Sequence, residues 1–312
     1  MKTQQNSNSK SGFSLVELMV SMAITLIIVT VLVSITSMAM DTWNRSRSEL
    51  RASRQAKAMV DAMTRDLEGL VIRSGNNFEW LSAIVDLSDD VGESSNASKL
   101  IFFTAATDRY NGEIGTDDDL GGDVSCVGYG MAWKDPIGAT SDEKLKTFVL
   151  NRLLVDPKET FDTLLGQADI GSKFLPSTAL GDRLSEQENF VCENVFQFTV
   201  TFHVQVKVTE TDNTVTPPVT NVRTVTVPVT LGEDTTKFQI LGTGNVTDYV
   251  DPDPELTALI PSGRITAVGI AVSVLSNSGI TQLPVKLGKD GFEAWLAKNS
   301  YQYSKLIQLP GM

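Results

Sequence analysis

The chain has 312 residues, of which 38 are acidic and 26 are basic, so its formal net charge is −12. This excess of acid argues against a surface built to bind nucleic acid, because such surfaces gather Lys and Arg against the phosphates. Two cysteines are too few for a disulfide-built scaffold or a four-thiolate zinc site, and one histidine is too few for a two-histidine metal motif. The length allows one or two domains with a sizeable core.

A polar leader precedes a long apolar run at the N-terminus. Residues 1–12 contain Lys2 and Lys10 but no acid, and no charged residue occurs from Leu18 to Met40. As a helix, this run would measure roughly 35 Å, enough to cross a hydrocarbon core of ~30 Å. Three interpretations compete for this run: a secretory signal peptide, a plain membrane anchor and a prepilin signal. Secretory signals have a shorter apolar core of about 7–15 residues, which disfavours the first interpretation.

The stretch GFSLVELMV, residues 12–20, favours the third interpretation. It resembles the processing site of type IV pilins and of the pseudopilins of type II secretion. In that family a prepilin peptidase cuts after the Gly, and the new N-terminal Phe is N-methylated. The resemblance therefore implies cleavage between Gly12 and Phe13, methylation of Phe13, and a role in assembly for Glu17.

The carboxylate of Glu17 is notable because it stands at the start of the uncharged run. A carboxylate deep in hydrocarbon costs about 2.5–3.5 kcal/mol, so it needs a partner. Cleavage after Gly12 would expose an ammonium at Phe13, about one helical turn from Glu17. This amine would neutralise Glu17 in the same chain or in a neighbouring subunit, and the resemblance implies the neighbour. The alternative is that Glu17 lies among lipid headgroups at the interface.

The distribution of basic residues opposes the implied topology. The leader holds two Lys, whereas a more basic stretch, residues 45–57, follows the apolar run. A simple positive-inside count would place the C-terminal part in the cytoplasm. The family resemblance implies the reverse: a cytoplasmic leader, a single pass through the inner membrane, and a periplasmic C-terminal domain.

An amphipathic helix is predicted to continue beyond the membrane. Its apolar stripe is Trp43, Leu50, Ala52, Ala56, Met59, Val60, Met63, Leu67 and Leu70. Its polar face is Arg45, Arg51, Arg54, Lys57, Asp61, Arg65 and Asp66. Because the first proline of the chain is Pro136, we expect one helix over residues 13–70, ending near Gly69 or Gly75.

The rest of the chain is typical of an antiparallel β domain. The predicted strands are 99–105, 124–133, 146–155, 195–208, 219–231 and 265–275. Residues 195–208 alternate strictly between apolar and polar, which predicts one buried face. Their expected partner, 219–231, contains Pro228 and so is predicted to be an edge strand. Residues 209–218 and 232–262 are interpreted as insertions, and the small residues of 265–275 as a face that another backbone approaches, such as the helix.

These elements predict an α+β, pilin-like fold. Its parts are a leader (1–12), a transmembrane half-helix (13–40), an amphipathic half-helix (41–75) and a globular β-rich domain (76–312). The succession of Val-Gly-Tyr, Leu-Asn-Arg and the segment from Ile260 to Val272 also resembles the larger minor pseudopilins, notably the J-type component. The presence of Glu17 separates the chain from the K-type tip component, which lacks this acid.

Two further candidate sites rest on fewer residues. Asp117, Asp119 and Asp123 supply the oxygen ligands that Ca²⁺ prefers, but the spacing does not fit an EF-hand, so a solvated loop without cofactor is the favoured interpretation. Cys126 and Cys192 would both lie outside the cytoplasm, where a disulfide is permitted; two buried thiols are the alternative.

The sequence thus predicts a non-enzymatic minor pseudopilin that supports protein secretion. Its implied partners are other pseudopilins or pilins, prepilin peptidase, an inner-membrane assembly platform and the membrane itself. A minor pilin of a type IV or DNA-uptake pilus is the close alternative. A membrane-anchored periplasmic hydrolase or binding domain is the alternative from another class, although the chain has no G-x-S-x-G nucleophile motif and no phosphate-binding loop of the G-x-x-x-x-G-K-[ST] type.

Overall fold

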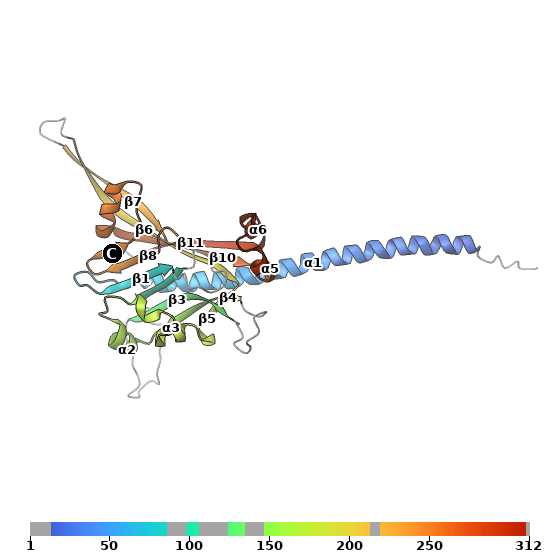
Figure 1. Ribbon diagram of the computed structural model, residues 1–312, viewed down its shortest axis with the longest axis horizontal. Helices are drawn as coiled ribbons and strands as arrows, with labels where there is room; N and C mark the ends of the chain where they lie inside the picture. The colour runs from blue at the N-terminus through green and yellow to red at the C-terminus, as the bar shows by residue number, and fades with distance from the viewer. Residues whose placement is uncertain (1–13, 86–97, 106–123, 135–146, 213–218, 310–312) are drawn as a thin grey trace, which may run out of the picture. The chain divides into compact units, whose positions relative to one another are not determined.

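The computed structural model describes residues 14–85, 98–105, 124–134, 147–212 and 219–309. Over these residues a long N-terminal helix is followed by two antiparallel sheets with short helices between the strands (Figure 1). This confirms the predicted α+β class. The chain forms two compact units, Met1–Leu50 and Arg51–Met312, and both contain part of the long helix.

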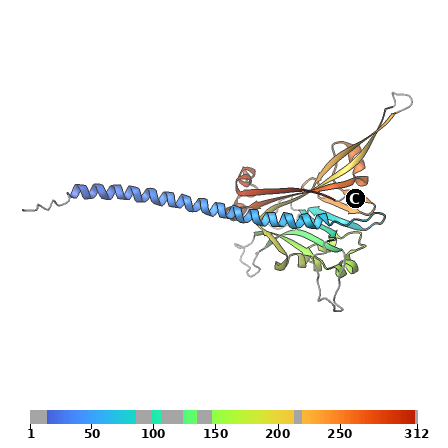
Figure 2. The same ribbon diagram turned by 180° about the vertical axis from the view of Figure 1, so that it is seen from behind.

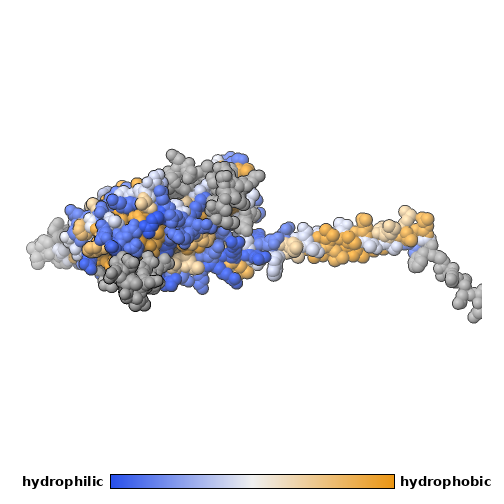
Figure 3. Space-filling view, turned by 90° about the horizontal axis from the view of Figure 1, so that it is seen from below, coloured by the Kyte–Doolittle hydropathy of each residue, from blue (hydrophilic) through white to orange (hydrophobic). Residues whose placement is uncertain are grey.

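Helix α1 spans Leu15–Glu68, which is 54 residues, close to the predicted 13–70. No Pro or Gly interrupts it, and Gly69 follows its last residue. In the first unit its large apolar side chains are exposed, from Leu15 to Trp43, and they form an apolar surface (Figure 3). Among the described residues, α1 is the helix long and apolar enough to cross a membrane.

The second unit contains a sheet of seven strands, in the order β5-β4-β3-β2-β1-β8-β9. Its strands are β1 Glu79–Val85, β2 Ser98–Thr104, β3 Ser125–Lys134, β4 Thr147–Leu154, β5 Phe190–Glu193, β8 Lys237–Leu241 and β9 Gly244–Thr247. All neighbouring pairs are antiparallel, as predicted.

A second sheet has four strands, in the order β11-β10-β6-β7. Its strands are β6 Val195–Asp212, β7 Val219–Thr230, β10 Arg264–Leu275 and β11 Ser300–Gln308. Strand β6 pairs with β7 as predicted, Phe202 opposite Val229, and β7 is an edge strand. The even-numbered apolar residues of β6 are buried from Phe196 to Val208, which matches the predicted alternation.

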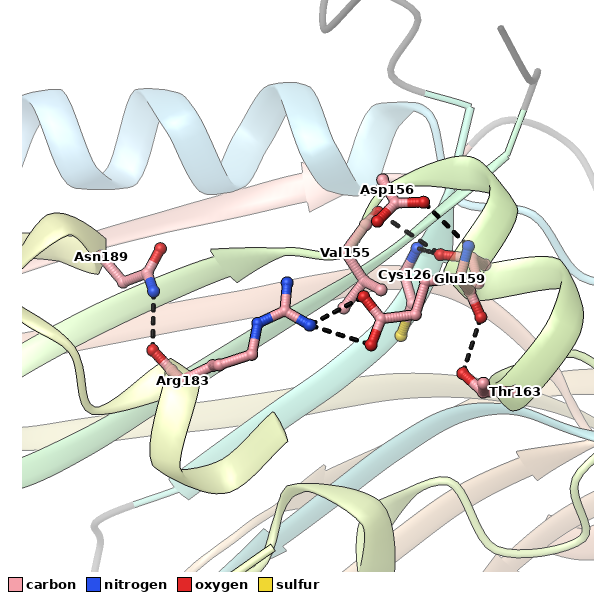
Figure 4. Close-up of polar contacts among 8 residues, drawn as sticks. Cys126, Val155, Asp156, Glu159, Thr163, Arg183 and Asn189 are labelled. Atoms are coloured by element: carbon pink, nitrogen blue, oxygen red, sulfur yellow. Dashed lines mark hydrogen bonds and ion pairs between the residues drawn. The ribbon is translucent and has the colours of Figure 1, made fainter. Parts of the chain in front are cut away.

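Short helical segments complete the second unit. They are α2 Pro157–Glu159, α3 Ala179–Leu184, α4 Pro254–Leu259, α5 Asn277–Lys286 and α6 Phe292–Asn299. A π-helical turn, Thr160–Leu164, and three 3₁₀ turns, Gly171–Phe174, Gln187–Asn189 and Ile260–Ser262, lie between them. An ion pair between Arg183 and Glu159, 2.7 Å, joins α3 to α2 (Figure 4).

The main core of the second unit is shared by α1 and the inner faces of both sheets. The helix contributes Ala52, Ala56, Met59, Val60, Met63 and Leu67. The seven-stranded sheet contributes residues such as Phe102 and Leu150, and the four-stranded sheet contributes residues such as Phe198 and Val268. This part of α1 therefore lies between the two sheets (Figure 2).

Three expectations about this domain were wrong. Residues 232–262 are not an insertion, because β8 within them pairs with β1 and extends the large sheet. The helix does not approach the small residues of β10; it shares the core with the large ones, Val268, Ile270, Val272 and Val274. Trp43 and Leu50 do not join the buried stripe of α1, since both are exposed, and this stripe begins at Ala52.

Candidate functional site

The N-terminal part of α1 presents a single carboxylate beside an otherwise uncharged surface. Glu17 lies in the first turn of the helix and is exposed, and the next charged residue is Asp41. The first turn is closed by the amide of Leu18, which donates to the carbonyl of Ser14 at 3.1 Å. Because the positive end of the helix dipole lies here, a negative charge in this turn is favoured.

Five hydroxyl groups in this apolar surface are satisfied within the helix. Each donates to a main-chain carbonyl three or four residues earlier, at 2.8–2.9 Å; they belong to Ser21, Thr25, Thr30, Thr36 and Thr42. In a bilayer every polar group needs such an internal partner. Glu17 is the charged group at the start of this segment, and its carboxylate requires a partner when the segment enters hydrocarbon. Gly12 and Phe13 lie outside the described residues, so cleavage and methylation there stay predictions.

A buried polar cluster ties the other end of α1 to the large sheet. Two of the three nitrogens of the Arg152 side chain contact the Asp66 carboxylate, Nε at 2.6 Å and Nη2 at 2.7 Å. The Tyr129 hydroxyl donates to the same carboxylate at 2.5 Å and accepts from Arg152 Nε at 3.0 Å. The side chains of Arg152 and Asp66 are only 10% and 5% exposed. The three residues come from β4, α1 and β3, so the cluster crosslinks three elements.

The charges of the cluster are those expected for an ion pair. Burial raises the pKa of Tyr129 well above its usual value, and the negative charge of Asp66 raises it further, so the phenol stays protonated and donates. Burial alone would lower the pKa of Arg152, but the hydrogen bonds and charge of Asp66 outweigh it and raise that pKa. A bidentate guanidinium–carboxylate pair is among the strongest polar contacts in proteins.

The position of Asp66 differs from our expectation. The helical pattern predicted that Asp66 lies on the polar, solvated face of α1, whereas the residue is only 4% exposed and therefore buried. A signal for this was present, since Asp66 follows Met59 by seven residues and Met63 by three, the spacing of one helix face. The other two ion pairs of α1 are more exposed: Arg51 with Glu193 at 2.8 Å, and Asp61 with Lys305 at 3.5 Å.

The structure describes the two candidate cysteines but not the candidate calcium ligands. Asp117, Asp119 and Asp123 lie outside the described residues, and calcium binding there stays a prediction. No group of three His, Cys, Asp or Glu side chains that could hold a metal occurs in the part of the chain that the structure describes. Cys126 and Cys192 are both free and buried, so the possible disulfide is not formed and the interpretation as two buried thiols holds.

The sheet geometry explains why the two cysteines do not pair. Cys126 is in β3 and Cys192 in β5, with β4 between these strands, and strands lie about 4.8 Å apart. They also belong to different cores: Cys192 to the one shared with α1, and Cys126 to the one beneath the short helices. The Cys126 amide donates to Thr160 in the adjoining π-helical turn, at 3.0 Å (Figure 4). Burial raises the pKa of Cys192 to about 12, which leaves it an unreactive thiol.

A second buried carboxylate, that of Glu79, joins β1 to its neighbours. Its oxygens accept from the Gln239 side chain of β8 and from the amide of Ile170, both at 2.5 Å. The residue is 1% exposed. Burial raises the pKa of Glu79 above its ordinary value of 4.5, and the charge of Asp169 adds to this rise, although the donors oppose it.

This raised pKa predicts a pH-dependent stability. The folded state binds the proton of Glu79 more tightly than the unfolded state, so the free energy of unfolding should fall as pH rises above 4.5 through the folded pKa. Glu79→Gln should flatten this fall, because the amide does not titrate. Urea unfolding at several pH values measures the slope, and Glu255→Gln, at an exposed residue, is the matched control. An unchanged slope in Glu79→Gln would contradict the prediction.

Comparisons with known proteins identify the N-terminal signal. Residues 7–33 match the model of the prokaryotic N-terminal methylation motif, which confirms the predicted prepilin-type signal. A solved type IV-like pilin from Thermus thermophilus aligns with 83% of this chain and 97% of its own, at 10% identity and a TM-score of 0.30, too low to support a structural argument. No curated protein matches the sequence.

Proposed function

We propose that this chain, which carries a prepilin-type N-terminal methylation motif, is a non-enzymatic minor pseudopilin or minor pilin. The motif at residues 7–33 carries the proposal, and it overlaps the start of a 54-residue helix. The apolar side chains of the first unit are exposed and need either lipid or other helices around them. A membrane before assembly and a bundle of like helices afterwards would both cover them.

Processing would supply the partner that Glu17 requires. Cleavage after Gly12 would leave an ammonium on Phe13, four residues from Glu17. Within hydrocarbon, an ion pair between this amine and a Glu17 carboxylate costs less than either charge alone. We infer that in the filament the amine of one subunit meets the Glu17 of its neighbour, so that each added subunit neutralises a charge.

We infer the position of this chain in the secretion filament from its resemblance to the larger minor pseudopilins. A subunit whose helix enters a short filament, and whose β domain faces the periplasm, would initiate or cap assembly and support protein secretion. Its partners would be other pseudopilins, prepilin peptidase and an inner-membrane assembly platform.

Co-expression with a prepilin peptidase tests the proposal. We expect the intact mass to fall by the mass of residues 1–12 and to rise by the mass of one methyl group added to Phe13. Gly12→Val should keep the full mass, because the peptidase requires the small residue. A chain that retains Met1 beside an active peptidase would contradict the filament function and favour a plain membrane-anchored domain.

A further inference from the structure

Buried positions of α1 that lie four residues apart carry the same or similar residue types, so the buried stripe changes little when the helix shifts by four residues. Ala52 and Ala56 are four residues apart, and so are Met59 and Met63; all four are buried. A four-residue shift toward the C-terminal end would put Ala52 in the place of Ala56 and Met59 in the place of Met63.

Other buried positions of α1 also have similar side chains in the observed register and in the register shifted by four residues. The same shift would put Met63 in the place of Leu67 and Val60 in the place of Thr64, which are changes of similar volume. Methionine also adapts to irregular gaps in a core. The polar mismatches are Ser48, Gln55 and Asp66, which would take the buried places of Ala52, Met59 and Leu70. The apolar contacts alone therefore separate the registers weakly.

The main-chain contacts at the end of the helix are also tolerant of a shift. The amide of Val71 donates to the carbonyl of Phe103, and the amide of Ala105 donates to the carbonyl of Gly69. Any residue other than proline can make such bonds, so they do not select which residue lies beside β2.

No acidic residue stands four residues before Asp66, where it could replace Asp66 after the shift. After the shift, Ala62 would lie beside Arg152, and the guanidinium would lose both of its carboxylate contacts while it remained buried. Leaving a buried charge without its partner is strongly unfavourable. We propose that the Asp66–Arg152–Tyr129 cluster fixes the axial register of α1 on the two sheets, and that Asp66 is its positioning residue.

The register matters for the proposed function, on which this consequence rests. It sets the length of α1 between Glu17 and the first helix residue that the sheets bury, which is Ala52 in the observed register. A slip of four residues would change this length by about 6 Å. A subunit in the wrong register would then bring its Glu17 to the wrong depth beside its neighbours.

Moving the carboxylate by one turn tests the proposal directly. In Ala62→Asp/Asp66→Ala, both charges are kept, and the pair re-forms when the helix slips by four residues. Spin labels at Arg54→Cys and Lys237→Cys, both exposed positions, report the distance between α1 and β8 in the full chain, and a second pair uses Gln302→Cys on β11. The native cysteines are fully buried and leave the labels to the introduced sites. We expect pulsed electron paramagnetic resonance to show at least one distance displaced, by up to about 6 Å, which is the length of a four-residue slip.

A variant without charges gives the complementary result. In Asp66→Leu/Arg152→Met/Tyr129→Phe, no group selects the register, so we expect a folded protein with two distance populations. The matched control is Asp61→Leu/Lys305→Met, which removes an exposed ion pair of the same helix and should keep one population.

Two outcomes would overturn the proposal. One is an unchanged distance, or a loss of cooperative unfolding, in Ala62→Asp/Asp66→Ala. The other is a single wild-type distance, or a loss of folding, in the variant without charges, since the cluster would then supply stability and not register. Neither measurement involves cleavage or assembly, so a failure here is distinguishable from a failure of the proposed function.

Discussion

Glu17→Ala is expected to be cleaved by prepilin peptidase at a rate close to that of the native chain but to enter filaments at least about ten-fold less often. The side chain lies exposed in the first turn of α1, at the start of an uncharged surface. Removing it leaves the new amine of Phe13 without a counter-charge in hydrocarbon. A penalty of about 2.5–3.5 kcal/mol for an unpaired charge there exceeds the 1.4 kcal/mol that corresponds to ten-fold.

The measurement separates processing from assembly. Intact mass gives the cleaved fraction, and the amount of the chain in sheared or purified filaments gives incorporation. Glu49→Ala is the matched control, because it removes an exposed carboxylate from the same helix beyond the uncharged run. Normal incorporation of Glu17→Ala would contradict the charge pairing, and a loss of incorporation in the control would show that the effect is not specific to Glu17.

The sequence predicted well those elements that have a strong periodic pattern. Strand β6 alternates over most of its length, so both its existence and its buried face were predictable. Helix α1 has neither Pro nor Gly, and its end was predictable from Gly69. The N-terminal signal was predictable because it is a local motif, whose meaning does not depend on the fold.

Elements defined by distant neighbours were not predictable in this way. Strand β8 is only five residues long, and it is a strand because β1 lies beside it. Strand β1 itself is buried over its first five residues and so shows no alternation. The same reason explains Asp66: a charge on a helix is normally solvated, and only Arg152, 86 residues later, makes burial favourable.

That dependence on a distant partner leads to the largest stability effect we expect. Arg152→Met should lower the free energy of unfolding of the second unit by about 3–5 kcal/mol, because it leaves the Asp66 carboxylate buried without its cation. The remaining donor, Tyr129, contributes one hydrogen bond to that carboxylate, which does not offset the loss.

Chemical denaturation of the full chain in detergent measures this effect. Arg183→Met is the matched control, since its pair with Glu159 is half-exposed, and exposed pairs contribute only about 0–1 kcal/mol. A destabilisation equal to that of the control would show that the buried pair does not stabilise the contact between α1 and the sheet.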